Sequence, residues 1–184
     1  FMKIGFISDT HGYLDDTKKA LGVLDGCDRI LHLGDVLAPG PRNGIHPGYD
    51  AKELAEVFAK RDDIFMVKGN CDADVDEQVM NRKFLDNIEV FLEWGDLKIF
   101  ALHGYRESLE ERVQKAKKLG AYIVVVGHTH IKRFEEIDGI IYMCPGSPTL
   151  PKDGSKSVVI YEDGVFKFYN VDTSEVISSY KIGH

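Results

Sequence analysis

The 184-residue sequence predicts an α/β fold in which two packed β-sheets carry helices on their outer faces. The first part of the chain alternates short apolar runs with helix-like segments, which is typical of parallel strands joined by helices. The last part consists of short β-rich runs separated by hairpin turns, which favours antiparallel pairing. The composition shows no linker between these parts, so we expect a single domain over residues 1–184.

The alternating pattern occupies the first 70 residues or so of the chain. Short apolar runs predict three strands, at residues 3–8, 29–33 and 64–67. The spacing of apolar residues predicts two helices, over 14–24 and 50–60. Asp50 is a suitable N-cap for the second helix. Residues 36–49 contain three prolines and three glycines, which predicts a loop.

The rest of the chain is richer in β-structure. Gly95-Asp96 separates two apolar runs, at 88–94 and 97–102, and predicts a hairpin. A charged amphipathic segment predicts a helix over 106–119, and the YIVVV run at 122–126 predicts a buried strand. Short β-rich runs then fill residues 133–182, with hairpin turns expected at Asp138-Gly139 and Asp163-Gly164.

The composition is that of an ordinary globular protein, with 43% hydrophobic and 29% charged residues. No apolar run approaches the roughly 18 residues that a membrane span requires, so we expect no membrane partner. The formal net charge of −7 disfavours long-range attraction to nucleic acid, which is therefore not an expected partner. A small anionic substrate stays compatible with this charge because bound metal ions can reverse the local field.

The three cysteines are Cys27, Cys71 and Cys144, and their spacing matches neither a zinc motif nor a disulfide framework. Scattered thiols of this kind fit a reducing compartment, so we expect a cytoplasmic protein. The sequence leaves the oligomeric state open. Exposed apolar residues in the second sheet would allow a homo-oligomer.

Side chains that can bind metal follow five of the predicted strands. In chain order the motifs are Asp9-Thr10-His11, Gly34-Asp35, Gly69-Asn70-Cys71-Asp72, His103-Gly104 and Gly127-His128-Thr129-His130. Ligands collect at the carboxyl ends of strands in sheets of this class. Glycine next to a ligand permits the tight turn and close backbone approach that such a site needs. The sequence therefore predicts a metal site built from Asp9, His11, Asp35, Asn70, His103, His128 and His130.

Seven ligands can hold two ions if one carboxylate bridges them, and Asp35 is the natural bridge because it stands alone on its strand. Residues i and i+2 of an extended chain point the same way, so Asp9 and His11 are expected to share an ion. The same holds for His128 and His130 if the chain is extended there. Mixed nitrogen and oxygen ligands favour Mn, Fe, Zn or similar ions over calcium. Two such ions roughly 3.5–4 Å apart would clamp a phosphoryl oxygen and generate a hydroxide nucleophile.

Each of these residues also has an ordinary structural explanation. An aspartate at a strand end is more often a helix cap, and a single histidine there is more often a structural hydrogen-bonding group. The metal hypothesis depends on the combination. Four of the seven histidines fall within these motifs, and all five motifs stand at strand ends.

The order D-x-H, G-D, G-N-x-D, H-G and G-H-T-H resembles the calcineurin-like metallophosphoesterase superfamily over about residues 3–150. Several details resemble the small bacterial and archaeal YfcE-like phosphodiesterases within it. They are the short chain, G-N-C-D at 69–72, G-P-R-N at 40–43, and Pro145-Gly146-Ser147 followed by Pro151-Lys152.

This resemblance implies a four-layer αββα sandwich of two mixed β-sheets flanked by helices. It also implies a dinuclear centre, with one ion on Asp9, His11, Asp35 and His130 and the other on Asp35, Asn70, His103 and His128. The expected cofactors are two divalent metal ions, Mn²⁺ first, with Fe, Zn, Ni or Co as alternatives. The implied activity is metal-dependent hydrolysis of the phosphodiester bonds of a small substrate by a metal-bridging hydroxide.

One departure from the family pattern concerns the leaving group. Many members have histidine after the asparagine, where this chain has Cys71, and that histidine is commonly assigned to leaving-group protonation. A thiol is a poorer proton source, so we expect better activity on activated aryl diesters than on esters with alkoxide leaving groups. Cys71 is also explained as a small buried residue behind the site. With Asn70 and His103 it completes the candidate catalytic residues.

Residues near these motifs carry weaker expectations. Arg42 and Asn43 belong to the loop after Asp35 and are candidate substrate-binding residues, although Arg42 is more readily explained as a solvated loop residue. We expect Asp72 to cap a helix, with a role in orienting the site as the alternative. Further expectations are a buried strand position for His32, an exposed one for His46, and disorder for His184. Trp94 and Tyr105 fit either the core or the rim of the site.

The main alternative to an enzyme is a protein-assembly scaffold like the retromer subunit Vps29, which has a similar fold. Scaffolds of this kind lose metal ligands, whereas all seven positions are filled here. A nuclease is disfavoured by the net charge and by the lack of a Lys/Arg-rich segment. A phosphomonoesterase is a further alternative. A protein phosphatase is disfavoured because the short chain leaves little room for substrate docking.

Overall fold

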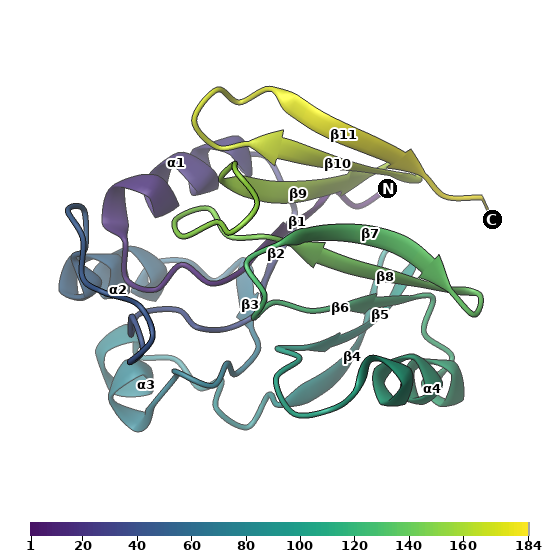
Figure 1. Ribbon diagram of the computed structural model, residues 1–184, viewed down its shortest axis with the longest axis horizontal. Coiled ribbons are helices and arrows are strands. Elements are labelled where there is room, and N and C mark those ends of the chain that lie inside the picture. The colour runs from purple at the N-terminus through teal and green to yellow at the C-terminus, as the bar shows by residue number, and fades with distance from the viewer. Residues whose placement is uncertain (184) are drawn as a thin grey trace.

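The computed structural model describes residues 1–183, so the expectation for His184 falls outside the described residues. Two β-sheets lie face to face, with helices on their outer sides (Figure 1). Four helices lie within the described residues: α1 (Leu14–Val23), α2 (Ala51–Ala59), α3 (Asp74–Met80) and α4 (Leu109–Leu119). The expected sandwich of two mixed sheets flanked by helices is confirmed.

The first sheet has six strands in the order β11-β10-β9-β1-β2-β3. These are β1 (Ile4–Ile7), β2 (Arg29–His32), β3 (Ile64–Met66), β9 (Ser157–Glu162), β10 (Val165–Asn170) and β11 (Val176–Lys181). The strands β1, β2 and β3 are parallel, and β9 pairs with β1 in the antiparallel direction. The sheet is therefore mixed, with its parallel part formed by the first strands of the chain.

The second sheet has five strands in the order β4-β5-β6-β8-β7. These are β4 (Glu89–Trp94), β5 (Leu97–Leu102), β6 (Ile123–Val125), β7 (Lys132–Ile137) and β8 (Ile140–Pro145). Its centre is parallel, because β6 pairs in parallel with both β5 and β8. The carboxyl ends of β5 and β6 therefore lie at one edge of this sheet, next to the carboxyl ends of β1, β2 and β3.

The alternation of side chains along the strands builds three cores. In β5, Ile99 and Ala101 pack between the sheets, whereas Phe100 and Leu102 pack on the outer side with Val113 of α4. Successive residues of a strand point to opposite faces, so one short apolar strand serves two layers. The outer face of the first sheet packs in the same way against α1, α2 and α3. Figure 1 shows α1 and α4 on opposite sides of the molecule.

The predicted elements are confirmed, with two differences. The helix α3 was not predicted, because it has seven residues and two of its apolar side chains, Val75 and Val79, are exposed. The helix predicted from residue 106 starts at Leu109 instead. Ser108 accepts a hydrogen bond from the Glu111 amide, and the Glu111 carboxylate accepts one from the Ser108 amide. This capping box fixes the start of α4.

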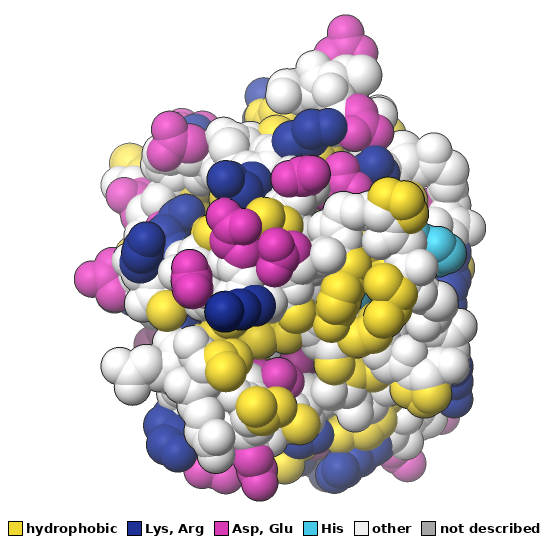
Figure 2. All heavy atoms as spheres, turned by 90° about the vertical axis from the view of Figure 1, so that its left-hand side faces the viewer, with side chains coloured by type: hydrophobic (Ala, Val, Ile, Leu, Met, Phe, Trp, Pro, Cys, Tyr) yellow, Lys and Arg dark blue, Asp and Glu magenta, His cyan; other side chains and the backbone are white. Residues whose placement is uncertain are grey.

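The side of the molecule that carries α2 and α3 has a partly apolar surface. A groove of about 520 Å³ lies there, with Tyr49, Val75 and Val79 among its lining residues. Figure 2 shows hydrophobic side chains gathered near the middle of this side. Within residues 1–183, no helix combines the length and apolar character needed to cross a membrane.

Candidate metal centre

The predicted metal ligands gather where the strands of both sheets end. Asp9 and His11 follow β1, Asp35 follows β2 and Asn70 follows β3, all in the first sheet. His103 follows β5, and His128 and His130 follow β6, in the second sheet. Six of these seven residues are buried or half-buried, and Asn70 is exposed. The fold therefore brings together side chains that lie up to 121 positions apart in the sequence.

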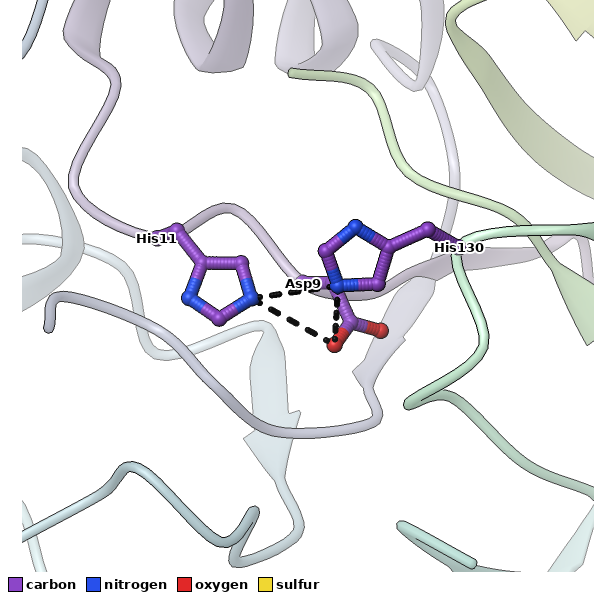
Figure 3. Close-up of side chains that lie close together, drawn as sticks. All are labelled: Asp9, His11 and His130. Carbon is purple, nitrogen blue, oxygen red and sulfur yellow. Dashed lines mark hydrogen bonds and ion pairs between the residues drawn. The ribbon is translucent and has the colours of Figure 1, made fainter. Parts of the chain in front are cut away.

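One half of the site consists of Asp9, His11 and His130. The Oδ1 atom of Asp9 lies 3.7 Å from His11 Nε2 and 3.3 Å from His130 Nε2, and the two Nε2 atoms are 3.2 Å apart. Figure 3 shows the two imidazole rings turned toward each other beside the carboxylate. Three ligand atoms converge on a space small enough for one ion.

The other half consists of Asp35, His103 and His128, whose ligand atoms also converge. Asn70 adjoins it, since its Oδ1 atom lies 3.1 Å from His128 Nδ1. The Oδ2 atom of Asp35 lies 3.2 Å from His103 Nε2 and 3.7 Å from His11 Nε2, so it faces both halves. This is the position that a bridging carboxylate requires. Asp9 Oδ1 also lies 3.7 Å from His103 Nε2, so the two halves are in contact.

Three of the histidines are held by backbone carbonyls through their Nδ1 atoms. His11 Nδ1 lies 2.8 Å from Ala38 O, His103 Nδ1 lies 2.6 Å from Leu33 O, and His130 Nδ1 lies 2.7 Å from Leu150 O. A carbonyl can only accept, so each Nδ1 carries hydrogen and each Nε2 atom faces the site. Metal-binding histidines are oriented by this kind of hydrogen bond.

The site contains polar atoms that lack a hydrogen-bond partner among the described residues. Asp9 Oδ1 and His103 Nε2 are both buried and unsatisfied. Burial opposes the ionisation of Asp9, but His103, His11 and His130 hold the pKa of its carboxyl well below the ordinary value. Burial also favours neutral His103, yet Asp9 and Asp35 raise its pKa to about 9. Such a site attracts positive charge, and its residues fit a divalent cation.

The backbone at the ligands is not extended. Asp9, His11, Asp35, His128 and His130 have positive φ angles between 48° and 72°. This left-handed conformation costs about 1–2 kcal/mol per residue. The expectation that residues i and i+2 share an ion through extended backbone is therefore wrong. Asp9 and His11 do meet, but through a turn, and His128 and His130 point into different halves of the site.

Two glycines allow the strand ends to approach each other closely. A Cβ atom on Gly69 would lie 2.2 Å from Asp35 Oδ1, and one on Gly127 would lie 2.1 Å from Ser8 Oγ and 2.8 Å from Asp9 Oδ2. None of these three distances is tolerable for non-bonded atoms. The predicted role of glycine beside the ligands is therefore confirmed at both positions.

The carboxylate of Asp72 holds the backbone around Asp35. It is buried and accepts hydrogen bonds from the amides of Asp35 (2.9 Å), Val36 (2.9 Å) and Gly69 (2.7 Å). Burial, partly opposed by the bond from Val36 and reinforced by the charge of Asp35, raises the pKa of Asp72 to about 6. The expectation that Asp72 caps a helix is wrong, since α3 begins after Ala73. Its alternative role, orienting the site, agrees with these contacts.

Ser147 and Thr149 support the turn at Asp9, and sequence reasoning assigned them no role. Ser147 Oγ donates to Asp9 O (2.8 Å), and Thr149 Oγ1 lies within hydrogen-bonding distance of both Asp9 O (3.2 Å) and Thr10 O (3.0 Å). Both side chains are buried. Only the Pro145-Gly146-Ser147 motif signalled this segment in the sequence.

A cavity of about 440 Å³ opens over the site. Its lining includes Cys71 and the two candidate substrate-binding residues, Arg42 and Asn43. Arg42 is exposed, whereas Asn43 is half-buried and donates to Pro39 O. The Cys71 sulfur lies within 4.8 Å of the nearest potential ligand atoms of His11 and Asp35. Burial together with the charge of Asp35 raises the pKa of its thiol to about 12. Cys71 therefore faces the site rather than the core.

The remaining histidines and aromatic residues fall into clear positions. His32 is fully buried in β2, and burial lowers its pKa to about 3, so it is a neutral structural residue. His46 is exposed and stacks on Tyr13. Trp94 belongs to the core between the sheets. Tyr105 lies at the rim of the site, with its ring 5.8 Å from that of His103 and 6.2 Å from that of His128.

Comparison with known structures identifies relatives of the same architecture. A phosphoesterase from Escherichia coli, YfcE, superposes with a TM-score of 0.86 at 27% identity, covering 99% of this chain and 100% of the other. The zinc complex of Vps29 from Entamoeba histolytica superposes with a TM-score of 0.66 over 98% of each chain. At 18% identity, the second match shows the fold alone.

Sequence comparison identifies relatives of this chain and the family to which it belongs. Phosphodiesterase YfcE of Escherichia coli K12 is 32% identical over 168 residues, which cover 84% of this chain and 83% of that protein. Phosphodiesterase MJ0936 of Methanocaldococcus jannaschii is 30% identical over 156 residues, with coverages of 79% and 83%. Residues 2–163 match the model of the calcineurin-like phosphoesterase superfamily domain. This chain belongs to the calcineurin-like phosphoesterase superfamily.

Proposed function

We propose that this protein is a phosphodiesterase with two divalent metal ions, acting on a small substrate in the cytoplasm. The observation that carries the proposal is the arrangement of the seven predicted ligands. They form two groups that share Asp35, and two of their buried atoms, Asp9 Oδ1 and His103 Nε2, lack partners. Phosphodiesterase YfcE and Phosphodiesterase MJ0936 are relatives at 30% identity or more, which supports the same reaction here.

The candidate ligands would form two groups, one for each ion. Asp9, His11 and His130 would hold the first ion, and Asn70, His103 and His128 the second, with Asp35 between them. Two bound ions supply Lewis acidity at the phosphoryl oxygens and lower the pKa of the attacking water. The ligand set of nitrogen and oxygen atoms suits Mn²⁺, which we propose as the working metal.

The other residues of the cavity orient the substrate. Arg42 and Asn43 lie in its lining and would hydrogen-bond phosphate oxygens or the leaving group. Cys71 lies beside Asn70, with its sulfur 3.6 Å from the Asn70 amide nitrogen, where it would meet the leaving group.

The proposal is tested by removing metal with a chelator, adding Mn²⁺ back, and assaying bis(4-nitrophenyl) phosphate beside 4-nitrophenyl phosphate. Metal content is measured by mass spectrometry of the loaded protein, and Asp35→Asn is the matched variant. We expect about two ions per chain and diester hydrolysis that depends on metal and is lost in Asp35→Asn. Monoester turnover that exceeds diester turnover would make the phosphomonoesterase alternative correct. A chain that binds no metal would contradict the proposal.

A further inference from the structure

Four basic side chains surround the metal centre, although the protein as a whole carries a formal charge of −7. They are Arg42, Lys68, Arg106 and Lys152, and they come from four separate loops. Within residues 1–183, none of the four forms an ion pair with a carboxylate, whereas the nearby Lys132 is paired with Asp153 at 2.9 Å. Unpaired cations beside a phosphate-binding centre are available to an anionic ligand.

Two of these cations flank the half of the site formed by Asp9, His11 and His130. Arg42 and Lys152 both line the cavity and are exposed. The backbone amide of Lys152 donates to His130 O (3.0 Å), which places Lys152 beside that ligand. Arg42 belongs to the loop whose Ala38 carbonyl holds His11 Nδ1. We refer to these residues as the Arg42–Lys152 pair.

The other two cations flank the half formed by Asp35, His103 and His128. Tyr105 contacts the rings of both histidines, and its own ring carries two cations. Lys68 Nζ lies 5.8 Å and the Arg106 guanidinium carbon 5.0 Å from the centre of the Tyr105 ring. Cation–π contact holds them at the rim without neutralising them. We refer to them as the Lys68–Arg106 pair.

The Lys68–Arg106 pair adjoins His103 and His128 through Tyr105, whereas the Arg42–Lys152 pair lines the cavity beside His11 and His130. A simple aryl diester has a single negative charge, which the metal centre itself would meet. The cavity of about 440 Å³ is within the size range of sites for drug-sized ligands, so it has room for groups beyond one phosphate. The basic pairs are therefore available to the additional negative charges of a larger anion.

We propose that the centre takes a phosphodiester with further phosphate groups on both sides of the scissile one. The Arg42–Lys152 pair holds the outer phosphate on one side and the Lys68–Arg106 pair holds that on the other. This inference rests on the proposed function, because it places the scissile phosphate on the metal ions. The net charge of −7 argued against nucleic acid, but screening limits that repulsion to about 8–10 Å, and the pairs act within this range.

The test compares two dinucleotides that share one diester linkage. TpT has no outer phosphates, and pTpTp has one at each end. Both are made with a phosphorothioate at the internal linkage, and their binding to the Mn²⁺-loaded protein is measured by calorimetry, with their integrity checked by mass spectrometry. We expect pTpTp to bind at least about tenfold more tightly than TpT, with a preference that falls as salt is raised from 50 to 200 mM.

Single variants assign this preference to the two pairs. Lys152→Gln and Lys68→Gln should each reduce the pTpTp-to-TpT affinity ratio by about threefold to tenfold. Lys60→Gln is the matched control, since Lys60 is exposed and precedes β3, at the end of the strand opposite to the site. It should leave the ratio unchanged. Equal affinities for the two dinucleotides, or a ratio that neither Lys152→Gln nor Lys68→Gln changes, would overturn the proposal.

Two further measurements complete the test. A dinucleoside tetraphosphate carries four phosphates joined directly by anhydride bonds, so its charges are spaced more closely than those of pTpTp. Tighter binding of this compound than of pTpTp would identify nucleotide polyphosphates as the source, and the reverse would identify short oligonucleotides. Hydrolysis of bis(4-nitrophenyl) phosphate is assayed in parallel. Normal hydrolysis without a pTpTp preference would contradict only the proposal that the two basic pairs hold outer phosphates. A pTpTp preference without hydrolysis of any diester would contradict the proposed function alone.

Discussion

At the scale of single residues, the site depends on side chains that do not face the metal position. Asp72 is the clearest case, because its two oxygens accept three backbone amides and fix the loops that carry Asp35 and Asn70. Ser147 and Thr149 do the same for the turn at Asp9. Five candidate ligands have left-handed backbone, and hydrogen bonds of this kind stabilise that strained conformation. The ligands are thus positioned before a cation binds.

Replacing Asp72 with asparagine should destabilise the protein by about 2–4 kcal/mol, because an amide cannot accept from all three donors and leaves buried N–H groups unsatisfied. Urea unfolding of the metal-free protein measures this loss. Asp74→Asn, an exposed neighbour at the start of α3, is the control and should change stability by less than about 0.5 kcal/mol. Equal stabilities of the Asp72 and Asp74 variants would show that the three hydrogen bonds contribute nothing.

Replacing Cys71 with histidine should raise the rate on diesters with alkoxide leaving groups. Imidazole is a better proton donor than a thiol near neutral pH, and position 71 faces the cavity. We expect an increase of about tenfold or more in kcat for a dialkyl phosphodiester, both of whose leaving groups are alkoxides, within the usual range for general acid catalysis. Activity on bis(4-nitrophenyl) phosphate should change less, because its leaving group needs no proton. An unchanged alkoxide rate would show that residue 71 takes no part in leaving-group departure.

At the scale of elements, the sequence predicted features that depend on interactions between neighbouring residues and missed features that depend on contacts between residues far apart in the chain. Asp-Gly turns identified the β7–β8 and β9–β10 hairpins because turn chemistry is local. The seven-residue α3 escaped prediction because its exposed Val75 and Val79 obscure the amphipathic pattern. The contact of Ser147 with Asp9 spans 138 positions and has no local signal. Motif order predicted the candidate ligands, whereas their left-handed turns required the tertiary structure.

The start of α4 provides a prediction about an element. Ser108 and Glu111 form the capping box at the start of this helix. Ser108→Ala should lower the free energy of unfolding by about 0.5–2 kcal/mol, since helix amides lose their acceptor. Thermal unfolding monitored by circular dichroism measures the change. Ser108→Thr retains the hydroxyl group and should recover most of the stability, which a general packing defect at this position would not allow.

At the scale of the whole molecule, the metal centre lies between the two sheets. Asp9, Asp35 and Asn70 follow strands of the first sheet, and His103, His128 and His130 follow strands of the second. Vps29 of Entamoeba histolytica shares this fold, at an identity that carries no functional argument. In this chain, bound ions would join the sheets at the edge where the inner apolar core gives way to polar side chains.

Metal binding should therefore stabilise the fold as a whole. At a free Mn²⁺ concentration 100 times the dissociation constant, binding of one ion adds about 2.7 kcal/mol to the free energy of unfolding. For a chain of this length, this corresponds to a rise in Tm of roughly 5–11 °C. Differential scanning calorimetry with Mn²⁺ and with chelator measures the difference. Asp35→Asn and His130→Gln should reduce the rise, whereas His46→Gln, at an exposed position away from the ligands, should retain it. If all three variants keep the full rise, the ions bind elsewhere and do not connect the two sheets.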